Sequence, residues 1–405
     1  MALVRRPART LSALFGSLAL AGALMVVGAG TAGAAPSILR VGCGHGSYPT
    51  IGAAVGAAAS GETIMVCPGT YPGGVVVSRA LSIVGVGHPV IDATGQDNGV
   101  QVLASGSRIQ GLTVENAIGE GILVGLVPAP VSHVTISGNT VKHNDRGNPA
   151  GAPITNSSYP QCNANPATPT TPGDCGEGIH LANAFDSTVV GNTVVANSGG
   201  ILLSDDTGPT YGNLVAFNDV SGNVLDCGIT IAGHTPEVFG GGVHDNKILA
   251  NRVTGNGVAG QGGGVLLATG VPGNVPGIPG TGGAVYNNLV QGNYLAGNGL
   301  GGVTLHSHAP GENLNGNTIT GNTIGTNNLD PDMDFAGFGP QFFDGQTTGV
   351  IVAAASNVTI TIARNLIFNN VNGVWLGQVA GATITAAGTA SNRFVNVTNP
   401  VVTVS

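Results

Sequence analysis

Hydrophobic and polar residues alternate in very short segments along most of the chain, and the segments end at Asn or Gly. This alternation indicates short β-strands that bury one face. Asn and Gly tolerate left-handed backbone conformations, so we expect them at tight bends between the strands. Seven pairs of asparagines stand five residues apart: Asn139/Asn144, Asn192/Asn197, Asn218/Asn223, Asn251/Asn256, Asn293/Asn298, Asn317/Asn322 and Asn365/Asn370.

A second pattern, Gly-[Val/Ile]-x-[Val/Ile/Leu], follows most of these pairs, and we call it the Gly tetrad. Copies begin at Gly178, Gly200, Gly228, Gly264, Gly302, Gly349 and Gly373, with earlier versions at Gly99 and Gly121. The closest spacings are 22 to 24 residues. Repetition at this period predicts a solenoid with one coil per repeat, about ten coils in all. The apolar tetrad positions, such as Ile179 and Leu181, should stack inside it.

Composition supports an all-β solenoid. Charged residues make up only 8% of the chain, whereas 42% are hydrophobic, which excludes a disordered polymer. The 69 glycines exclude an α-helical repeat. Because each coil of a solenoid buries its core against its neighbours, we expect one repeat domain despite the length of 405 residues.

The first 34 residues have the features of a secretion signal. Three arginines precede the apolar run Leu11–Gly30, and Ala32-Gly33-Ala34 forms a small-residue cleavage site. A transmembrane anchor is the alternative. No later apolar run is long enough to span a bilayer. We therefore expect a secreted protein whose formal charge changes from −8 to −11 when three arginines are removed. A nucleic-acid partner is not expected, because the chain has no basic patch.

The N-terminal part of the mature chain has a different pattern. Apolar residues at helical spacing predict a short helix over residues 50–59, which would cover the open end of the solenoid. The segment YPTIGAAVGAAASGETIMVCPGTYPGGVVVSRALSIVGVG (residues 48–87) resembles the opening of right-handed parallel β-helix proteins with the pectin-lyase fold. These include pectin methylesterases and secreted NosD-like repeat proteins. The resemblance implies a single-stranded right-handed parallel β-helix, with the cap and first coils in residues 35–98 and repeats in 99–405.

The resemblance does not extend to esterase activity. The methylesterase pattern places Glu after GTY, whereas Gly73 and Gly74 follow Pro72 here, and no Gln-Asp-Thr-Leu segment is present. Five cysteines in an exported chain predict disulfides with one thiol left over. Cys43 with Cys67 and Cys162 with Cys175 are the expected pairs, leaving Cys227 buried and free. A Cys175–Cys227 pair is the alternative.

Candidate chemistry gathers around the Gly tetrads, because the longest insertions flank them on both sides and could form a groove. The outward tetrad residues should form its floor. They are His180, Leu202, Thr230, Leu266, Thr304, Ile351 and Trp375. Of these, His180, Thr230, Thr304 and Trp375, together with His308 at the margin, are the expected substrate contacts.

Ionisable residues are scarce in this chain but collect at the two margins of the floor. Asp206, His234 and His308 occupy the same offset from their tetrads, which predicts that Asp206 and His234 are neighbours. Asp205 and His306 lie on the same margin, and Glu177 and Asp226 precede their tetrads on the other. Two carboxylates beside a groove are what glycosidic cleavage requires. We therefore expect catalysis by Asp205, Asp206, Asp226, His234, His306 and Glu177.

In this hypothesis Asp206 is the general acid, its pKa adjusted by His234, and Asp226 or Glu177 is the base or nucleophile. Lys and Arg lie away from the floor, which favours hydrolysis, or another glycosyl-transfer reaction run by carboxylates, on a largely neutral polysaccharide or oligosaccharide over uronate elimination. The alternative is a non-catalytic β-helix that binds a glycan or a metal.

No cofactor is required by this chemistry, but two sets of residues suggest a divalent cation. Asp206, His234 and His308 suit a transition metal. Asp330, Asp332 and Asp334 alternate like calcium-loop ligands, although Phe335 occupies the position that should be Gly. The surrounding segment 330–345 is instead expected to form an acidic, aromatic lid. Ordinary turn chemistry remains the simplest explanation for any single Asp or His.

Overall fold

The computed structural model describes residues 37–144, 176–235, 237–270, 283–331 and 344–405, and residues 36–405 form one compact unit. The predicted signal peptide, Cys162, Cys175 and nearly all of the acidic aromatic insert lie outside the described residues. Within those residues, no helix is long and apolar enough to cross a membrane.

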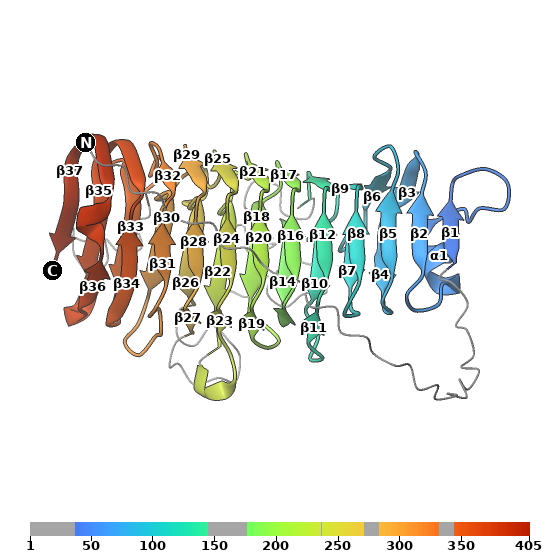
Figure 1. The fold of residues 1–405 in the computed structure, drawn as a ribbon, viewed down its shortest axis with the longest axis horizontal. Helices are drawn as coiled ribbons and strands as arrows, with labels where there is room; N and C mark the ends of the chain where they lie inside the picture. The colour runs from blue at the N-terminus through green and yellow to red at the C-terminus, as the bar shows by residue number, and fades with distance from the viewer. Residues whose placement is uncertain (1–36, 145–175, 236, 271–282, 332–343) are drawn as a thin grey trace, which may run out of the picture. The chain divides into compact units, whose positions relative to one another are not determined.

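Parallel strands stack coil upon coil from β1 at one end to β37 at the other (Figure 1). The first ladder contains twelve strands, somewhat more than the ten coils expected. They are β1 (Ile38–Val41), β2 (Thr63–Val66), β5 (Ser82–Gly85), β8 (Arg108–Gln110), β12 (Thr135–Ser137), β16 (Thr188–Val190), β20 (Leu214–Ala216), β24 (Lys247–Leu249), β28 (Leu289–Gln291), β31 (Thr318–Thr320), β34 (Val358–Ala363) and β36 (Ile384–Ala387).

The second ladder follows the first after one bend in each coil. It contains β3 (Thr70–Pro72), β6 (Val90–Asp92), β9 (Thr113–Glu115), β13 (Thr140–Lys142), β17 (Thr193–Val195), β21 (Asp219–Ser221), β25 (Arg252–Thr254), β29 (Tyr294–Ala296) and β32 (Thr323–Ile324).

The third ladder carries the Gly tetrads and, as described below, the candidate site. It contains β4 (Val75–Val77), β7 (Val100–Val102), β10 (Ile122–Gly125), β14 (Glu177–Ala182), β18 (Gly199–Ser204), β22 (Ile229–Gly233), β26 (Val265–Thr269), β30 (Val303–Ser307) and β33 (Thr348–Ala354). The last two long strands, β35 (Leu366–Gln378) and β37 (Arg393–Val404), run through both the second and third ladders.

In five coils a short fourth ladder lies after the third-ladder strand and before the first-ladder strand of the next coil. It contains β11 (Val131–Ser132), β15 (Ala184–Phe185), β19 (Thr210–Tyr211), β23 (Val243–His244) and β27 (Val285–Tyr286). On its outer side Phe185, Tyr211, His244 and Tyr286 stack face to face, with ring centroids 4.7 to 5.1 Å apart. Among the described residues, 3-10 turns lie at Glu237–Phe239, Val379–Gly381 and Thr389–Ser391.

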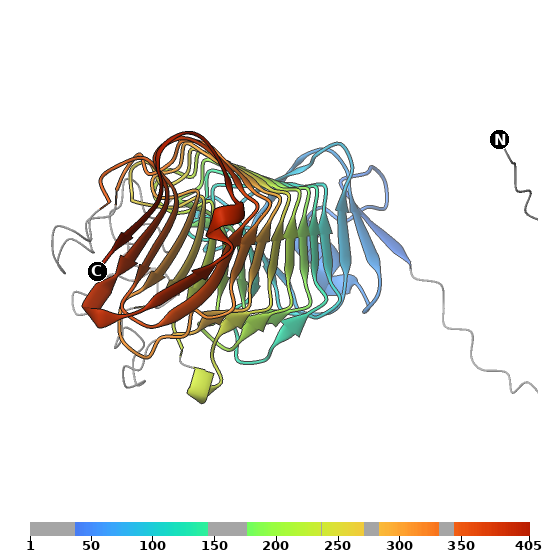
Figure 2. The same cartoon turned by 60° about the vertical axis from the view of Figure 1, so that its left-hand side comes forward.

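The apolar tetrad positions stack inside the solenoid, as the alternation predicts. Ile179, Ile201 and Ile229 are direct partners on successive coils and are at most 1% exposed. The turns of successive coils also lie over one another (Figure 2). The right-handed parallel β-helix is thereby confirmed, and its core is one continuous column of Val, Ile and Leu.

Buried asparagines form ladders of their own at the bends. In nearly every step the Oδ1 of one Asn accepts hydrogen bonds from the backbone N–H and the Nδ2 of the Asn one coil earlier, as between Asn192 and Asn218. The step from Asn327 to Asn370 keeps only the backbone bond. The ladder asparagines do not take the left-handed conformation that we expected. The preceding residue takes it, as Gly191 (φ 64°) and Ala196 (φ 54°) show. These asparagines are therefore needed for the hydrogen bonds of their side-chain amides and not for a left-handed backbone conformation.

A third asparagine ladder was not predicted, and it corrects one of the seven pairs. Asn213, Asn246, Asn288 and Asn317 stack in that order at the bend before the first ladder. Asn317 therefore belongs to this ladder. On that coil the true pair is Asn322 with Asn327, which receive bonds from Asn293 and Asn298.

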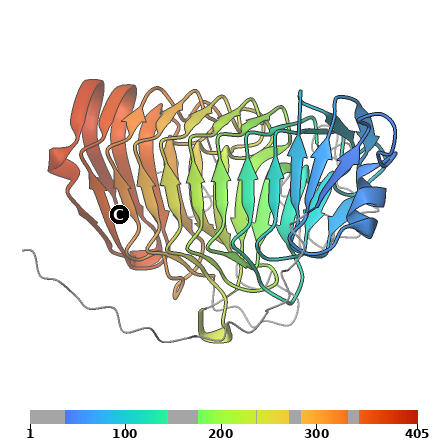
Figure 3. The same cartoon turned by 45° about the vertical axis from the view of Figure 1, so that its right-hand side comes forward.

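The cap at the N-terminal end agrees with the sequence. Helix α1 (Ile51–Ala57) begins after Thr50, whose hydroxyl accepts from Ala53 N–H, and it lies at the β1 end of the stack (Figure 3). Its buried residues, Ile51, Ala54 and Val55, belong to the core cluster. Cys43 and Cys67 form a disulfide with Cα atoms 5.3 Å apart, which confirms that pairing.

We predict that Asn218→Ala destabilises the solenoid by about 3 kcal/mol, because it leaves the buried N–H of Asn192 without its acceptor and removes the side-chain amide bonds to Val189 and Asn251. Chemical denaturation measures the loss. Asn357→Ala is the control, since Asn357 is exposed and accepts only from Thr383 N–H. Equal losses for the two variants would contradict a special role for the ladder.

Candidate functional site

The predicted floor of the third ladder is present in the expected register. The seven predicted residues, His180, Leu202, Thr230, Leu266, Thr304, Ile351 and Trp375, follow one another on successive coils, and Leu123 precedes them in the same column. Most of them, however, are covered. Thr304 has no exposed surface, and Trp375 is 4% exposed in an apolar cluster with Ile351 and Val379. Thr304 and Trp375 therefore cannot contact a substrate in this arrangement, which corrects that part of the prediction.

Two residues farther along each strand, the outward column contains three small side chains followed by a histidine. Ser204, Ala232, Ala268 and His306 are successive partners. Ala232 and Ala268 remain partly exposed, as does Leu266 on the floor. This partly exposed strip over β22 and β26 runs between the Ser204 and His306 coils.

Asp206 and His234 meet at one edge of this strip, as predicted. His234 Nδ1 lies 2.7 Å from Asp206 Oδ1, and the Ser204 hydroxyl donates to Asp206 Oδ2 at 2.6 Å. The pair is open to solvent, with 33% of the His234 side chain and 19% of Asp206 exposed. Burial alone would raise the pKa of Asp206, but His234, His180 and the Ser204 hydroxyl together hold it well below its usual range.

This low pKa corrects the role expected for Asp206. A general acid must hold a proton at the working pH, whereas Asp206 is ionised. An ionised carboxylate on Nδ1 orients the imidazole and stabilises its protonated form, as in Asp–His arrangements generally. His234 is therefore the member of the pair suited to carry a proton.

Asp205 faces the other way and holds a loop. Its carboxylate is 1% exposed and accepts hydrogen bonds from the backbone N–H groups of His234, Thr235 and Gly242. Burial raises the pKa of Asp205 to about 6 against the opposing effects of His234 and the backbone donors. With both oxygens used in this way, Asp205 is positioned to fix the segment 234–242 and not to meet a substrate.

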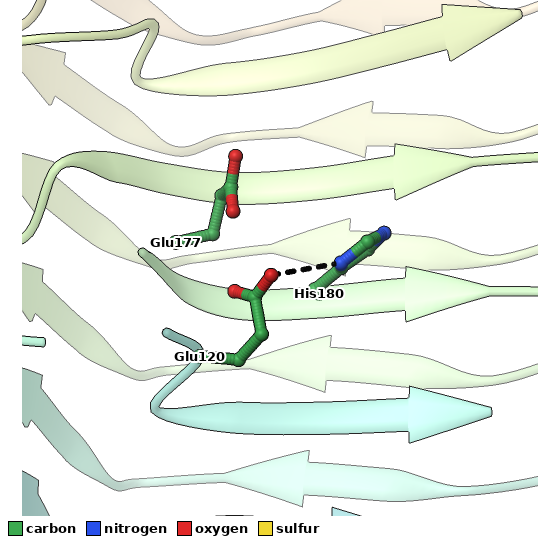
Figure 4. A group of neighbouring side chains, drawn as sticks. All are labelled: Glu120, Glu177 and His180. Atoms are coloured by element: carbon green, nitrogen blue, oxygen red, sulfur yellow. Dashed lines mark hydrogen bonds and ion pairs between the residues drawn. The ribbon is translucent and has the colours of Figure 1, made fainter. Parts of the chain in front are cut away.

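His180 connects the two margins, which the sequence placed at opposite ends of the strand. Its Nε2 lies 2.8 Å from Ser204 Oγ and 3.9 Å from Asp206 Oδ2, and its Nδ1 lies 3.2 Å from Glu120 Oε1 (Figure 4). Glu120, Glu177 and His180 are each 1% exposed. A polar chain therefore runs from buried Glu120 through His180, Ser204 and Asp206 to His234 at the surface.

Sequence reasoning missed Glu120. Its signal is its place directly before the tetrad of Gly121, the position that Glu177 occupies before Gly178. Glu177 in turn lies beside Gly199, where a Cβ atom would come within 3.2 Å of Glu177 and 3.3 Å of Asp226.

Asp226 stays at this margin, next to a buried thiol. Its Oδ1 accepts from Cys227 N–H, and burial raises its pKa. Cys227 is a free, buried thiol, as expected, and burial raises its pKa well above the usual value.

The metal site expected from Asp206, His234 and His308 is not assembled. His308 Nδ1 lies 2.6 Å from the carbonyl oxygen of Thr269, and its backbone N–H donates to Glu312. Among the described residues, the group whose ligand atoms gather within 4.8 Å of one another is Glu120, Glu177 and His180, and this group could bind a metal. The stacking offset predicted the column but not the direction in which each side chain turns.

His306 lies with His308 at the far side of the strip. The two rings meet edge to face with centroids 5.9 Å apart, and His306 is 5% exposed. Burial, and then the neighbouring His308, lower the pKa of His306 to about 3. A histidine that stays neutral in this way is poorly suited to deliver a proton.

The family model of the right-handed β-helix region matches residues 82–276. The chain is a right-handed β-helix protein. No curated protein sequence matches it.

Three of the solved structures similar to this β-helix protein each have a TM-score below 0.5. The Dettilon tailspike protein has 14% identity over 83% of this chain (TM-score 0.45), and this chain spans 62% of the tailspike's length. The A-module of mannuronan C-5 epimerase AlgE6 from Azotobacter vinelandii has 16% identity, covering 87% of this chain and 93% of its own (0.43). An alginate lyase from Paenibacillus has 16% identity, covering 85% and 95% (0.44).

We predict that Asp205→Asn lowers the free energy of unfolding by about 3 kcal/mol, because the new amide NH₂ faces backbone donors. Denaturation of the variant measures the loss. Asp219→Asn, at an exposed position on β21, removes the same charge and should change stability little. An Asp205→Asn protein as stable as the control would show that the loop does not depend on this carboxylate.

A second prediction concerns acid sensitivity. Because the folded-state pKa of His306 is lowered to about 3, the unfolded chain binds the extra proton first as the pH falls. Relative to His306→Asn, the wild type should lose stability between pH ~6.5 and ~3, with a slope approaching about 1.4 kcal/mol per unit. His88→Asn is the control at an exposed histidine. Parallel pH profiles for wild type and His306→Asn would refute the prediction.

Proposed function

We propose that this protein is a secreted, carbohydrate-active β-helix that acts on a polysaccharide along the strip over β22 and β26. The observation that carries the proposal is the Asp206–His234 contact of 2.7 Å at the edge of that strip. It is an ionised carboxylate paired with an imidazole, and both side chains are partly exposed. Elsewhere along the strip, the small side chains of Ala232 and Ala268 leave room for a polysaccharide to lie against the sheet.

The division of labour follows from the contacts. Asp206 holds the His234 ring through Nδ1, so that Nε2 is the nitrogen that exchanges a proton with a substrate or with water. Ser204 and His180 support Asp206 from behind through hydrogen-bonding contacts. Attack of an activated water on a glycosidic carbon, with proton return to the leaving oxygen, is the hydrolysis that we favour.

A neutral glycan is the favoured substrate class. The strands of the third ladder from β4 to β33 contain no Lys or Arg. Two nearby cations of the second ladder are engaged elsewhere: Lys142 pairs with Glu115 at 3.2 Å, and Arg252 lies over the Tyr294 ring. A polyuronate would therefore meet carboxylates at the strip without compensating charge.

A non-catalytic glycan-binding β-helix is the second candidate. The burial of most of the floor favours it, because only Leu266, Ala232 and Ala268 are available beside the Asp206–His234 pair. The two candidates differ in whether Asp206 affects turnover or only binding.

We predict that Asp206→Asn lowers turnover by about 10²–10⁴-fold on any glycan that the wild type cleaves. A panel of neutral and acidic polysaccharides, read by reducing ends and by the absorbance of unsaturated products, identifies the substrate and separates hydrolysis from elimination. Asp219→Asn should retain full activity. Full activity of Asp206→Asn would refute the catalytic role, and glycan binding without turnover in the wild type would establish the second candidate.

A further inference from the structure

We propose that Glu120, Glu177 and His180 form a binding site for one divalent transition-metal ion or zinc, built into the sheet beneath the Asp206–His234 pair. The site stands on its own geometry and does not depend on the proposed activity. Glu120 precedes β10, whereas Glu177 and His180 belong to β14 on the next coil. Figure 4 shows the Glu120 carboxylate directed at the His180 ring, with Glu177 beside them.

The distances suit direct coordination. One ligand atom from each residue lies within 4.8 Å of the others, and Glu120 Oε1 lies 3.2 Å from His180 Nδ1. Two ligands about 2.1 Å from a tetrahedral ion would lie about 3.4 Å apart. An ion could therefore be accommodated with shifts of a few tenths of an ångström at that pair.

The burial of the three residues calls for a positive charge. Two carboxylates and an imidazole gather here with 1% exposure each, and buried carboxylates are costly unless they are paired or coordinate metals. Glu120 Oε2 is buried and makes no hydrogen bond to the described residues. That oxygen is an independent sign of a missing partner.

The hydrogen-bond chain on the other side fixes the state of His180. Ser204 donates its single hydroxyl proton to Asp206 Oδ2, 2.6 Å away. His180 Nε2 must then donate its own proton to Ser204 Oγ, 2.8 Å away. In a neutral ring, Nδ1 would then present a lone pair to the Glu120 carboxylate at 3.2 Å, which is repulsive. A cation between them, or a second proton on the ring, removes the conflict.

Protein metal sites commonly use this arrangement. A histidine ligand usually donates its other N–H to a carboxylate or a similar acceptor, which orients the ring. Here Ser204 and Asp206 supply that support. Imidazole with carboxylates suits zinc and its transition-metal neighbours, whereas calcium prefers oxygen ligands alone. Three protein ligands would leave a further position for water.

Isothermal titration of the full chain, stripped with a chelator and returned to chelator-free buffer at pH 7, tests the site with Zn²⁺ as the probe. We expect one ion per chain, not displaced by a similar concentration of Ca²⁺. Glu120→Gln should weaken the affinity at least tenfold while preserving shape. Ser204→Ala should weaken it by about 10–100-fold through His180 orientation alone.

Glu312→Gln is the matched control, because Glu312 is another buried glutamate, 2% exposed, that accepts from Thr269 and His308 on a distant coil. It should leave the affinity unchanged. Circular dichroism and thermal melting establish that each variant is folded. No zinc binding by folded wild type, or equal binding by Glu120→Gln and wild type, overturns the proposal and leaves a second proton on His180 as the explanation. Equal weakening by Glu312→Gln also overturns it.

Discussion

Buried asparagine amides are the constraint on which the rest of the structure depends. Within the ladders an Asn places its Oδ1 where it accepts from the N–H and, in nearly every step, the Nδ2 of the Asn one coil before, and an amide buried without such bonds would be costly. The bends of successive coils are therefore held in line. Coil length varies elsewhere, on both sides of the third ladder, as between Thr254 and Val265 and between Gly233 and Val243. The candidate site lies at the second of these segments.

The polar chain from Glu120 to His234 results from that alignment. Successive coils repeat every few ångströms, so one ionisable residue per coil at adjacent positions gives a continuous row of contacts. Exposure increases from 1% at Glu120 and His180 to 19% at Asp206 and 33% at His234. The buried end gathers two carboxylates and an imidazole away from solvent, and the open end is accessible to a ligand. His180 lies between the two ends and contacts Glu120 on one side and Ser204 on the other.

Much of the fold was predictable from sequence, because repeated motifs show which residues pair on successive coils. The Gly tetrads gave the floor column, helical spacing gave α1, and equal offsets from the tetrads placed Asp206 beside His234. Side-chain direction was not predictable in the same way. Asp205 and Asp206 are adjacent in sequence, yet one binds three backbone N–H groups and the other binds a histidine. Glu120 was missed because its partners lie 57 and 60 residues away and only the stacking of coils unites them.

We infer that His180, which lies between Glu120 and Ser204 in the row of polar side chains, carries its proton on Nε2. Nitrogen-15 NMR of histidine-labelled protein, with His180→Gln to assign the signals, tests it most directly. We expect a proton on His180 Nε2 with and without Zn²⁺, and a change at Nδ1 when zinc is added. A proton confined to Nδ1, or a zinc-induced change at Nε2, would contradict it.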